Sequence, residues 1–362
     1  MIFSILSFVF LIAILVLVHE WGHFWTARKL KIKVEEFGFG FPPRVGGITK
    51  NGILYSLNLL PLGGFVKIFG EGGEGEGNPE SFISRPVWQR FVVIGAGVFM
   101  NLVLAWVLFS FGAGLGTPSI IDEENAEEAG GAGVTIIGVV PKSPADAGGI
   151  QFGDVVTRLE NLDTSAAADV KKVQELQDFI ANNAGHKIKM GIKRGSAVVE
   201  VTAVPRVNPP EGEGSLGISI ALVGIVRAPW YTAPWEGAKR VVISLENIVS
   251  GFYSLFKDLF ASGKVSVDVS GPVGIFVVAG QAGQLGFAYF LNLIAVLSVN
   301  LAFLNAMPIP ALDGGRILFL AIEKVRGVKV NQRIEQMVHT IGFVVLILLM
   351  LAITYRDLTR FL

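Results

Sequence analysis

The chain has 362 residues, of which 51% are hydrophobic and 17% are charged, and its mean hydropathy is +0.57. This composition indicates a membrane protein that carries some soluble mass. The 30 basic and 30 acidic residues balance, so the charge indicates no nucleic-acid partner, and the absence of cysteine excludes thiolate metal ligands and disulfides.

Residues 1–30 are predicted to form the first transmembrane helix. Residues 2–18 carry no charge, and 17 apolar residues span roughly 26 Å, which is most of a bilayer core. No basic residue precedes this run and no small-residue cleavage site follows it, so we interpret it as a retained span rather than a signal peptide.

This helix ends in the pattern H-E-x-x-H, formed by His19, Glu20 and His23. On a helix the two histidines lie one turn apart on the same face, so both can reach one Zn²⁺. Glu20 can then act as general base towards a metal-activated water. A chance match is the alternative, but a chain with only four histidines offers few such matches.

Residues 31–87 follow on the side that the positive-inside rule assigns to the cytoplasm, because the first basic residues of the chain lie at 28–33. Residues 34–70 are predicted to form short strands broken by Gly and Pro. Two interpretations remain open here: a β-hairpin that dips into the membrane beside the first helix, or a small cytoplasmic β subdomain. Residues 71–78, EGGEGEGN, are predicted to be a flexible acidic linker.

Residues 88–112 are predicted to form the second transmembrane helix. Gly95, Ala96 and Gly97 provide a small-residue face for close helix packing. Asn101 is polar in the middle of the span, and the cost of burying an amide there suggests a buried partner.

Residues 118–206 show strand patterns on both sides of a helical pattern, and the run SPADAGGIQFGDVV resembles a PDZ domain. Such domains bind peptides by adding a strand to a sheet edge. Residues 207–284 are predicted to be a linker followed by an amphipathic helix on the outer membrane surface, with a fifth span as the less favoured alternative.

Residues 285–316 are predicted to form the third transmembrane segment, which contains Asn300 and Asn305 and breaks at MPIPALDGGR because proline cannot continue a helix. A cytoplasmic loop at 317–336 and a fourth transmembrane helix at 337–355 complete the chain, with the C-terminus outside. A catalytic zinc ion needs three protein ligands and one open position. Asp313, at matching depth, is the best third ligand; His339 is expected to be a packed histidine.

With these motifs in place, the chain resembles the site-2 protease family of intramembrane zinc metalloproteases, in particular its bacterial RseP-like type. The resemblance rests on HEWGH, YSLNLLPLGGFVKI, SGPVGI and NAMPIPALDGGR, and it covers nearly the whole chain. It implies that His19, His23 and Asp313 bind zinc and that Glu20 is the base. It also implies that the substrate strand is held by Gly63, Gly64, Phe65, Val66, Lys67, Asn300 and Asn305.

Two departures from the family pattern stand out. Val98 occupies a position where the family usually has proline, and only one PDZ-like segment is visible where the best-studied branch has two. The second departure puts in doubt any account of PDZ gating carried over from that branch, but not the chemistry.

The sequence therefore predicts a multi-pass α-helical membrane protein with about four transmembrane helices, a membrane-associated β-hairpin and an inserted extracytoplasmic PDZ-like α+β domain. It is expected to reside in the cell inner (cytoplasmic) membrane, with its active site near the cytoplasmic side and both termini outside. The predicted substrates are single-pass transmembrane proteins, such as anti-sigma factors or signal-peptide remnants, cut in regulated intramembrane proteolysis. Whether the PDZ-like domain excludes bulky outer domains or captures a peptide stays open. A transporter would not need H-E-x-x-H, and an inactive scaffold would not need Glu20.

Overall fold

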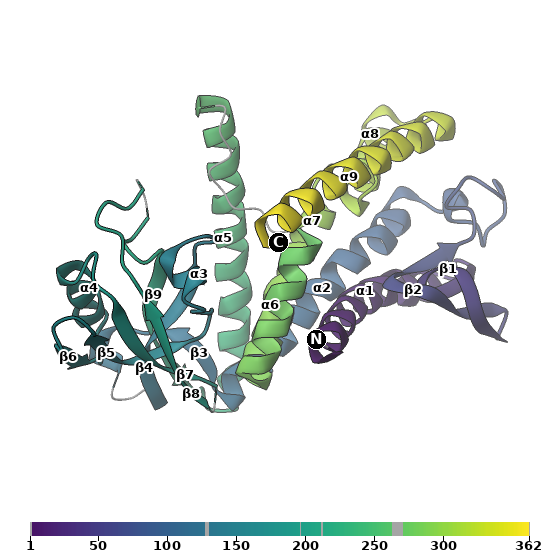
Figure 1. The fold of residues 1–362 in the computed structure, drawn as a ribbon. Coiled ribbons are helices and arrows are strands. Elements are labelled where there is room, and N and C mark those ends of the chain that lie inside the picture. Colours follow the sequence, from purple (N-terminus) through teal and green to yellow (C-terminus); the bar gives the residue numbers. More distant parts are fainter. Residues whose placement is uncertain (1, 127–129, 196, 211–212, 263–270, 362) are drawn as a thin grey trace. The chain divides into compact units, whose positions relative to one another are not determined.

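The computed structural model describes residues 2–126, 130–195, 197–210, 213–262 and 271–361 (Figure 1). Within it the chain divides into two compact units. The first comprises residues 1–111, 234–280 and 291–358, and the second comprises residues 112–233, 281–290 and 359–362. The two units are described separately below.

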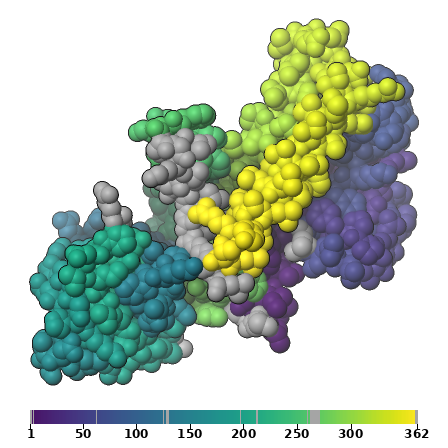
Figure 2. Space-filling view, turned by 45° about the horizontal axis from the view of Figure 1, so that its top comes forward, coloured from purple at the N-terminus to yellow at the C-terminus, as the bar shows by residue number. Residues whose placement is uncertain are grey.

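Among the described residues, four helices are long and apolar enough to cross a membrane: α1 (Ile2–Lys29), α2 (Val87–Leu115), α7 (Phe287–Ala306) and α9 (Gln332–Phe361). They coincide with the four spans expected from the sequence. None of the apolar stretch of α9 is buried inside the protein, and Figure 2 shows this helix uncovered at the surface. An apolar helix with no protein cover is suited to contact with lipid.

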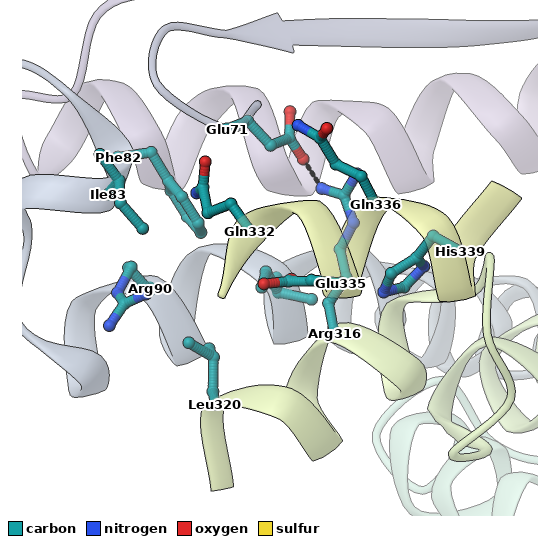
Figure 3. A pocket seen from close by; sticks show the side chains of 11 residues that line it. Glu71, Phe82, Ile83, Arg90, Arg316, Leu320, Gln332, Glu335, Gln336 and His339 are labelled. Carbon is teal, nitrogen blue, oxygen red and sulfur yellow. Dashed lines mark ion pairs between the residues drawn. The ribbon is translucent and has the colours of Figure 1, made fainter. Parts of the chain in front are cut away.

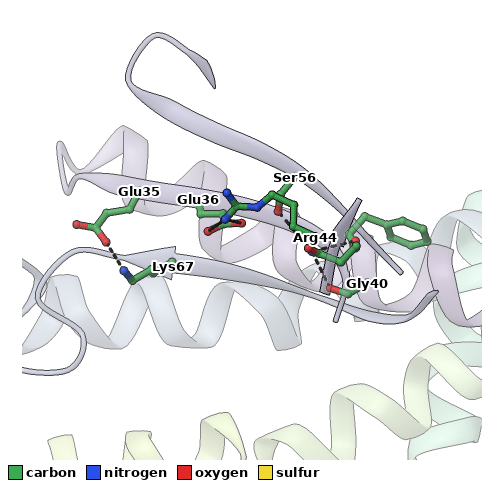
Figure 4. Close-up of polar contacts among 8 residues, drawn as sticks. Glu35, Glu36, Gly40, Arg44, Ser56 and Lys67 are labelled. Carbon is green, nitrogen blue, oxygen red and sulfur yellow. Dashed lines mark hydrogen bonds and ion pairs between the residues drawn. The ribbon is translucent and has the colours of Figure 1, made fainter. Parts of the chain in front are cut away.

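The segment after α1 forms a long antiparallel hairpin of β1 (Val34–Lys50) and β2 (Ile53–Ile68). The hairpin folds over itself, so that residues 36–39 pair with 54–57 on one side, and residues 34–39 pair with 64–68 on the other. Residues 64–68 are therefore paired through one edge only, the edge that faces residues 34–39. Figure 4 shows the polar contacts that hold this folded sheet, among them Glu36 with Arg44 and Glu35 with Lys67.

The hairpin is fixed to the helices by a shared apolar cluster. Phe24 and Ala27 of α1, Ile68 of β2, Val93 of α2 and Leu320 of α8 (Asp313–Arg326) are all buried in it. The segment that we expected to be a flexible linker is also held in place. Its Gly72 carbonyl accepts a hydrogen bond from Gln336 at 2.8 Å, and its Glu76 pairs with Lys329 at 2.7 Å.

Helix α5 (Ala233–Ser262) does not fit the prediction of a helix lying across the outer membrane surface. Near its start, the Trp106 indole of α2 donates to the Pro234 carbonyl at 2.9 Å. Towards its end, Phe252 packs on Phe303 of α7, with ring centroids 5.2 Å apart. Because these contacts involve both ends of α5, this helix runs alongside α2 and α7. One face of α5 packs into an apolar cluster that holds Val241, Leu245, Ile248 and Val299.

The predicted cytoplasmic loop at 317–336 is mostly helical, since α8 continues to Arg326 and α9 begins at Gln332. Proline excluded a continuous helix but did not exclude a new one starting at Asp313. A further helix, α6 (Pro272–Leu285), precedes α7. The buried Asp357 carboxylate of α9 accepts from the Gly271 and Gly274 N–H groups at the start of α6. The SGPVGI motif begins at residue 270, which lies outside the described residues.

The second unit contains a seven-stranded antiparallel sheet in the order β3-β9-β4-β5-β7-β8, with β6 beside β5. The strands are β3 (Thr117–Ile120), β4 (Gly130–Val139), β5 (Val155–Asn161), β6 (Ala167–Asp169), β7 (Ile188–Arg194), β8 (Ala197–Ala203) and β9 (Ile218–Val226). Helices α3 (Pro144–Ala147) and α4 (Val173–Asn182) accompany them over one apolar core. We call this the sheet domain; since β9 belongs to its sheet, it extends beyond the predicted limit at 206.

Candidate metal centre

Three side chains from two helices converge on one point. Nε2 of His19 lies 3.1 Å from Nε2 of His23, and Oδ2 of Asp313 lies 3.1 Å from the first and 3.4 Å from the second. Tetrahedral zinc with bonds of about 2.0–2.1 Å places neighbouring ligand atoms about 3.3 Å apart. The donor set therefore fits a zinc ion, and the two nitrogens and one oxygen leave a fourth position open.

The Asp313 oxygen supports this assignment. Oδ2 is buried and has no hydrogen-bond partner among the described residues, which is costly for a carboxylate unless a cation binds there. A carboxylate oxygen is also one of the ligands that zinc takes in catalytic sites.

Glycines let the helices approach closely enough to build the cluster. A Cβ on Gly97 of α2 would lie 2.7 Å from the His19 ring and would collide with the His23 ring. A Cβ on Gly22 of α1 would collide with the Ala96 backbone. Glycines 314 and 315 likewise pack the start of α8 on the carbonyls of residues 306–309, which fixes the position of Asp313. Ala96 and Gly97 of the predicted small-residue face therefore pack on α1, whereas a Cβ on Gly95 would meet nothing within 4 Å.

A second layer of contacts orients the two imidazoles. Nδ1 of His23 lies 2.9 Å from the Val93 carbonyl, which only accepts, so Nδ1 carries the proton and Nε2 has a free lone pair for a metal. The Asn101 amide lies 3.2 Å from Nδ1 of His19, and Oδ1 of Asn101 is buried without a partner. If the amide turns by half a turn, Oδ1 accepts from Nδ1–H and His19 takes the same tautomer.

Glu20 lies in the same cavity as the three ligands. The cavity has a volume of about 230 Å³, enough for more than one water molecule, and Phe65 and Val66 of the hairpin edge also line it. A Cβ on Gly64 would lie 3.6 Å from Cγ of Glu20, so the hairpin edge and the glutamate are immediate neighbours. The arrangement can hold a metal, a water and a carboxylate base beside an extended peptide.

The remaining predicted site residues lie in different surroundings. Gly63 faces the Phe41 ring, and the exposed Lys67 pairs with Glu35 at 2.8 Å. Asn300 donates to the Val296 carbonyl of its own helix, and neither Asn300 nor Asn305 is among the described residues that line the cavity. Their roles in substrate binding stay predictions. His339 accepts from the Ala311 N–H at 2.9 Å and is not part of the ligand cluster.

Sequence reasoning missed three members of the site. The Val93 carbonyl carries no side-chain signal at all. Arg316 and Glu71 both line the cavity and form an ion pair. The sequence places Arg316 only at the end of the predicted third transmembrane segment, and Glu71 only in an acidic linker. The signal that was available is that Arg316 follows Asp313 by three residues, and is therefore on the same face of any helix that starts there.

Comparison with known proteins shows the family of the chain. Residues 7–349 match the profile of peptidase family M50. A protein of Clostridium perfringens that is named a "putative zinc metalloprotease" is 35% identical over 99% of this chain and 98% of its own length. A protein of the same name from Clostridium acetobutylicum is 32% identical over 98% of this chain and 97% of its own length. Zinc metalloprotease RasP of Oceanobacillus iheyensis is 26% identical over 99% of both chains.

Proposed function

Because the chain belongs to peptidase family M50, the site-2 protease family, and is a zinc metalloprotease, we propose that it cuts membrane proteins in or next to their transmembrane segments. The observation that carries this proposal is the depth of the candidate ligands. His19 and His23 lie within α1, an apolar helix that is long enough to span a membrane. A metal held there reaches peptide bonds that a soluble protease does not.

The roles of the residues follow from their chemistry. His19, His23 and Asp313 would hold zinc, which when bound polarises a water molecule and the peptide carbonyl. Glu20 takes a proton from the attacking water and passes it to the leaving nitrogen. The water oxygen bonds to the carbonyl carbon as it gives up this proton, and the C–N bond breaks when the leaving nitrogen receives it.

Substrate binding is assigned to the hairpin edge at residues 63–67. A peptide in a transmembrane helix hides its carbonyls in hydrogen bonds, so it must unwind before it is cut. The segment 64–68 is paired through one edge only, and Phe65 and Val66 line the cavity. A substrate strand added there would regain backbone partners beside Glu20. Asn300 and Asn305 are proposed to form hydrogen bonds with the unwound backbone of the substrate farther from the metal.

The membrane orientation rests on the basic residues. Arg28 and Lys29 lie at the end of α1, and Lys324 and Arg326 lie at the end of α8. The positive-inside rule then puts the metal near the cytoplasmic face of the inner membrane and the sheet domain outside. The sheet domain is proposed to be PDZ-like, and to exclude substrates that keep a folded outer domain. Capture of a newly exposed peptide is the alternative.

The test uses the full chain purified in detergent and a tagged single-pass substrate. Glu20→Gln is expected to keep its zinc and to lose cleavage by about 10²–10⁴-fold, because an amide cannot accept the water proton. Glu80→Gln, an exposed glutamate outside the cavity, is the matched control and should cut normally. Cleavage by Glu20→Gln at the wild-type rate would remove Glu20 from the mechanism. Cleavage by the wild type of soluble substrates alone would contradict intramembrane proteolysis.

A further inference from the structure

One permanent cation shares the catalytic cavity with Glu20 and Asp313. Among the described residues that line the cavity, Arg316 is the only lysine or arginine. It lies one helical turn after Asp313 on α8, so the two side chains project from the same face of that helix. The start of α8 is fixed by its glycine contacts with the backbone of residues 306–309, so the position of this turn is fixed too.

The Arg316 guanidinium forms an ion pair with Glu71, as Figure 3 shows. Glu71 follows β2 directly, and its N–H donates to the Ile68 carbonyl at 3.2 Å. The ion pair thus joins the end of the hairpin edge, where a substrate strand is proposed to bind, to the helix that carries Asp313. Arg316 and Glu71 also line a second, smaller cavity next to the first.

The charges in the catalytic cavity are balanced only in the presence of a divalent cation. Glu20, Glu71 and Asp313 contribute three negative charges, and Arg316 contributes one positive charge, which leaves −2 with neutral imidazoles. A divalent ion brings this total to zero. The negative charge that develops on a peptide carbonyl oxygen during attack is then in excess, and an oriented guanidinium is suited to stabilise it.

We propose that Arg316 is a further catalytic residue, whose guanidinium donates a hydrogen bond to the carbonyl oxygen of the scissile peptide bond while Glu71 orients it. The inference rests on the proposed function of the cavity. As the water oxygen bonds to the carbonyl carbon, the π electron pair moves to the carbonyl oxygen, where Arg316 stabilises it. The pair returns when the C–N bond breaks and the leaving nitrogen takes the proton from Glu20.

A structural clamp is the competing explanation, because the same ion pair fastens the hairpin to α8. The two explanations predict different relative effects of neutralising Arg316 and neutralising Glu71. A clamp fails equally when either partner is neutralised, so Arg316→Gln and Glu71→Gln would have equal effects. A catalytic guanidinium is needed even when its orienting carboxylate is lost, so Arg316→Gln would have the larger effect.

The experiment compares four variants of the full chain: Arg316→Gln, Arg316→Lys, Glu71→Gln and Lys329→Gln. The last removes the ion pair with Glu76, which fastens the same segment to α9 but does not line the catalytic cavity. Each variant is assayed for kcat and KM on a transmembrane substrate and for zinc content. The affinity for a phosphinic peptide, whose tetrahedral anionic group resembles the attacked carbonyl, is measured as well.

Arg316→Gln is expected to keep stoichiometric zinc and a KM within about threefold of wild type, and to lose about 10²–10³-fold in kcat. Its affinity for the phosphinic peptide should fall in proportion to kcat/KM. Arg316→Lys should recover at least about tenfold of the loss, because it keeps the charge without the planar fork. Glu71→Gln should lose about tenfold or less, and Lys329→Gln should match the wild type.

Equal losses in Arg316→Gln and Glu71→Gln would overturn the proposal, as would a kcat for Arg316→Gln within threefold of wild type or an unchanged phosphinic-peptide affinity. If Arg316→Gln does not fold, Arg316→Lys decides, since it should lower kcat at constant KM and an unchanged kcat overturns the proposal. Failure here is separate from failure of the proposed function, which is judged by wild-type cleavage and by Glu20→Gln.

Discussion

Both units bury polar side chains, but those of the first unit include members of the candidate metal centre, whereas those of the sheet domain accompany one continuous apolar core. His19, Asn101 and Ser298 are at most 7% exposed in the first unit. In the sheet domain 16 apolar side chains form one buried cluster, which includes Leu159, Leu176 and Met190 at 0% exposure. The first unit therefore depends on a few exact contacts around the metal, and the sheet domain on packing spread over many residues. Single substitutions should act in different ways on the two.

The largest effect is expected for Asp313→Ala, which removes one of three proposed ligands. Bound zinc and proteolysis should both be lost, because two histidines alone hold a catalytic zinc ion poorly. Metal analysis of the purified variant and a cleavage assay measure the two losses. Hydrogen exchange of the sheet domain should be unchanged.

A matched control for this variant is Asp258→Ala, which changes an acidic residue of α5 that is not part of the ligand cluster. It should keep its zinc. Unchanged zinc stoichiometry and affinity in Asp313→Ala would move the third ligand elsewhere, and faster exchange in the sheet domain would break the contrast between the two units.

The reciprocal variant is Arg194→Ala in the sheet domain. Arg194 holds the fully buried Asp154 carboxylate through two contacts of 2.7 Å. Removing one partner of such a pair leaves an uncompensated buried charge and costs about 3–5 kcal/mol. Hydrogen exchange of β5 and β7 in the full chain should accelerate by about 100-fold or more.

Zinc content should not change in Arg194→Ala, since neither residue of the pair belongs to the ligand cluster of His19, His23 and Asp313. Lys189→Ala is the control, because Lys189 forms a solvent-accessible pair with Glu200 that contributes little to stability. Equal exchange in the two variants would contradict a dominant role for the buried pair.

The two units also differed in how far the sequence predicted them. Alternating patterns and turn residues are local signals, so strands and a helix of the sheet domain were predicted near β4, β5, β7, β8 and α4. The strand β9 was missed because a Pro- and Gly-rich segment precedes it. In the first unit, motif spacing predicted the residues that form the cluster of His19, His23 and Asp313.

What the sequence did not predict depends on contacts between distant segments. The amphipathic pattern of α5 is the same for a helix on a membrane surface and for a helix packed on other helices. Only its contacts with Trp106 and Phe303 distinguish the two. The pairing of Arg316 with Glu71 spans 245 residues of sequence, and although Arg316 ends the NAMPIPALDGGR motif, nothing in that motif indicates Glu71 as its partner.

A sharper test of the close packing in the first unit is Gly97→Ala. The added methyl group would lie 2.7 Å from the ring carbons of His19 and His23, so at least one imidazole must move. Gly95→Ala is the matched control on the same helix, because nothing lies within 4 Å of a Cβ there. Gly97→Ala is expected to lower cleavage by about 100-fold, since a displacement of about 1 Å in a catalytic site has such an effect. Normal activity in both variants would show that the cluster tolerates the methyl group.

The smallest predicted effect concerns Asn101, the buried amide beside His19. Zinc binding by Nε2 of His19 requires a proton on Nδ1, and that proton needs an acceptor; Oδ1 of Asn101 is the nearest candidate. Asn101→Leu keeps the volume but removes the acceptor, so zinc affinity should fall about 10–100-fold, measured by competition with a chelator. Asn101→Asp keeps an acceptor and should retain the affinity.

Ser298→Ala removes only the hydroxyl that donates to the Asn101 backbone carbonyl, and it controls for packing. Equal losses of affinity in Ser298→Ala and Asn101→Leu would assign the effect to helix packing, and unchanged affinity in Asn101→Leu would mean that the His19 tautomer is set without the amide.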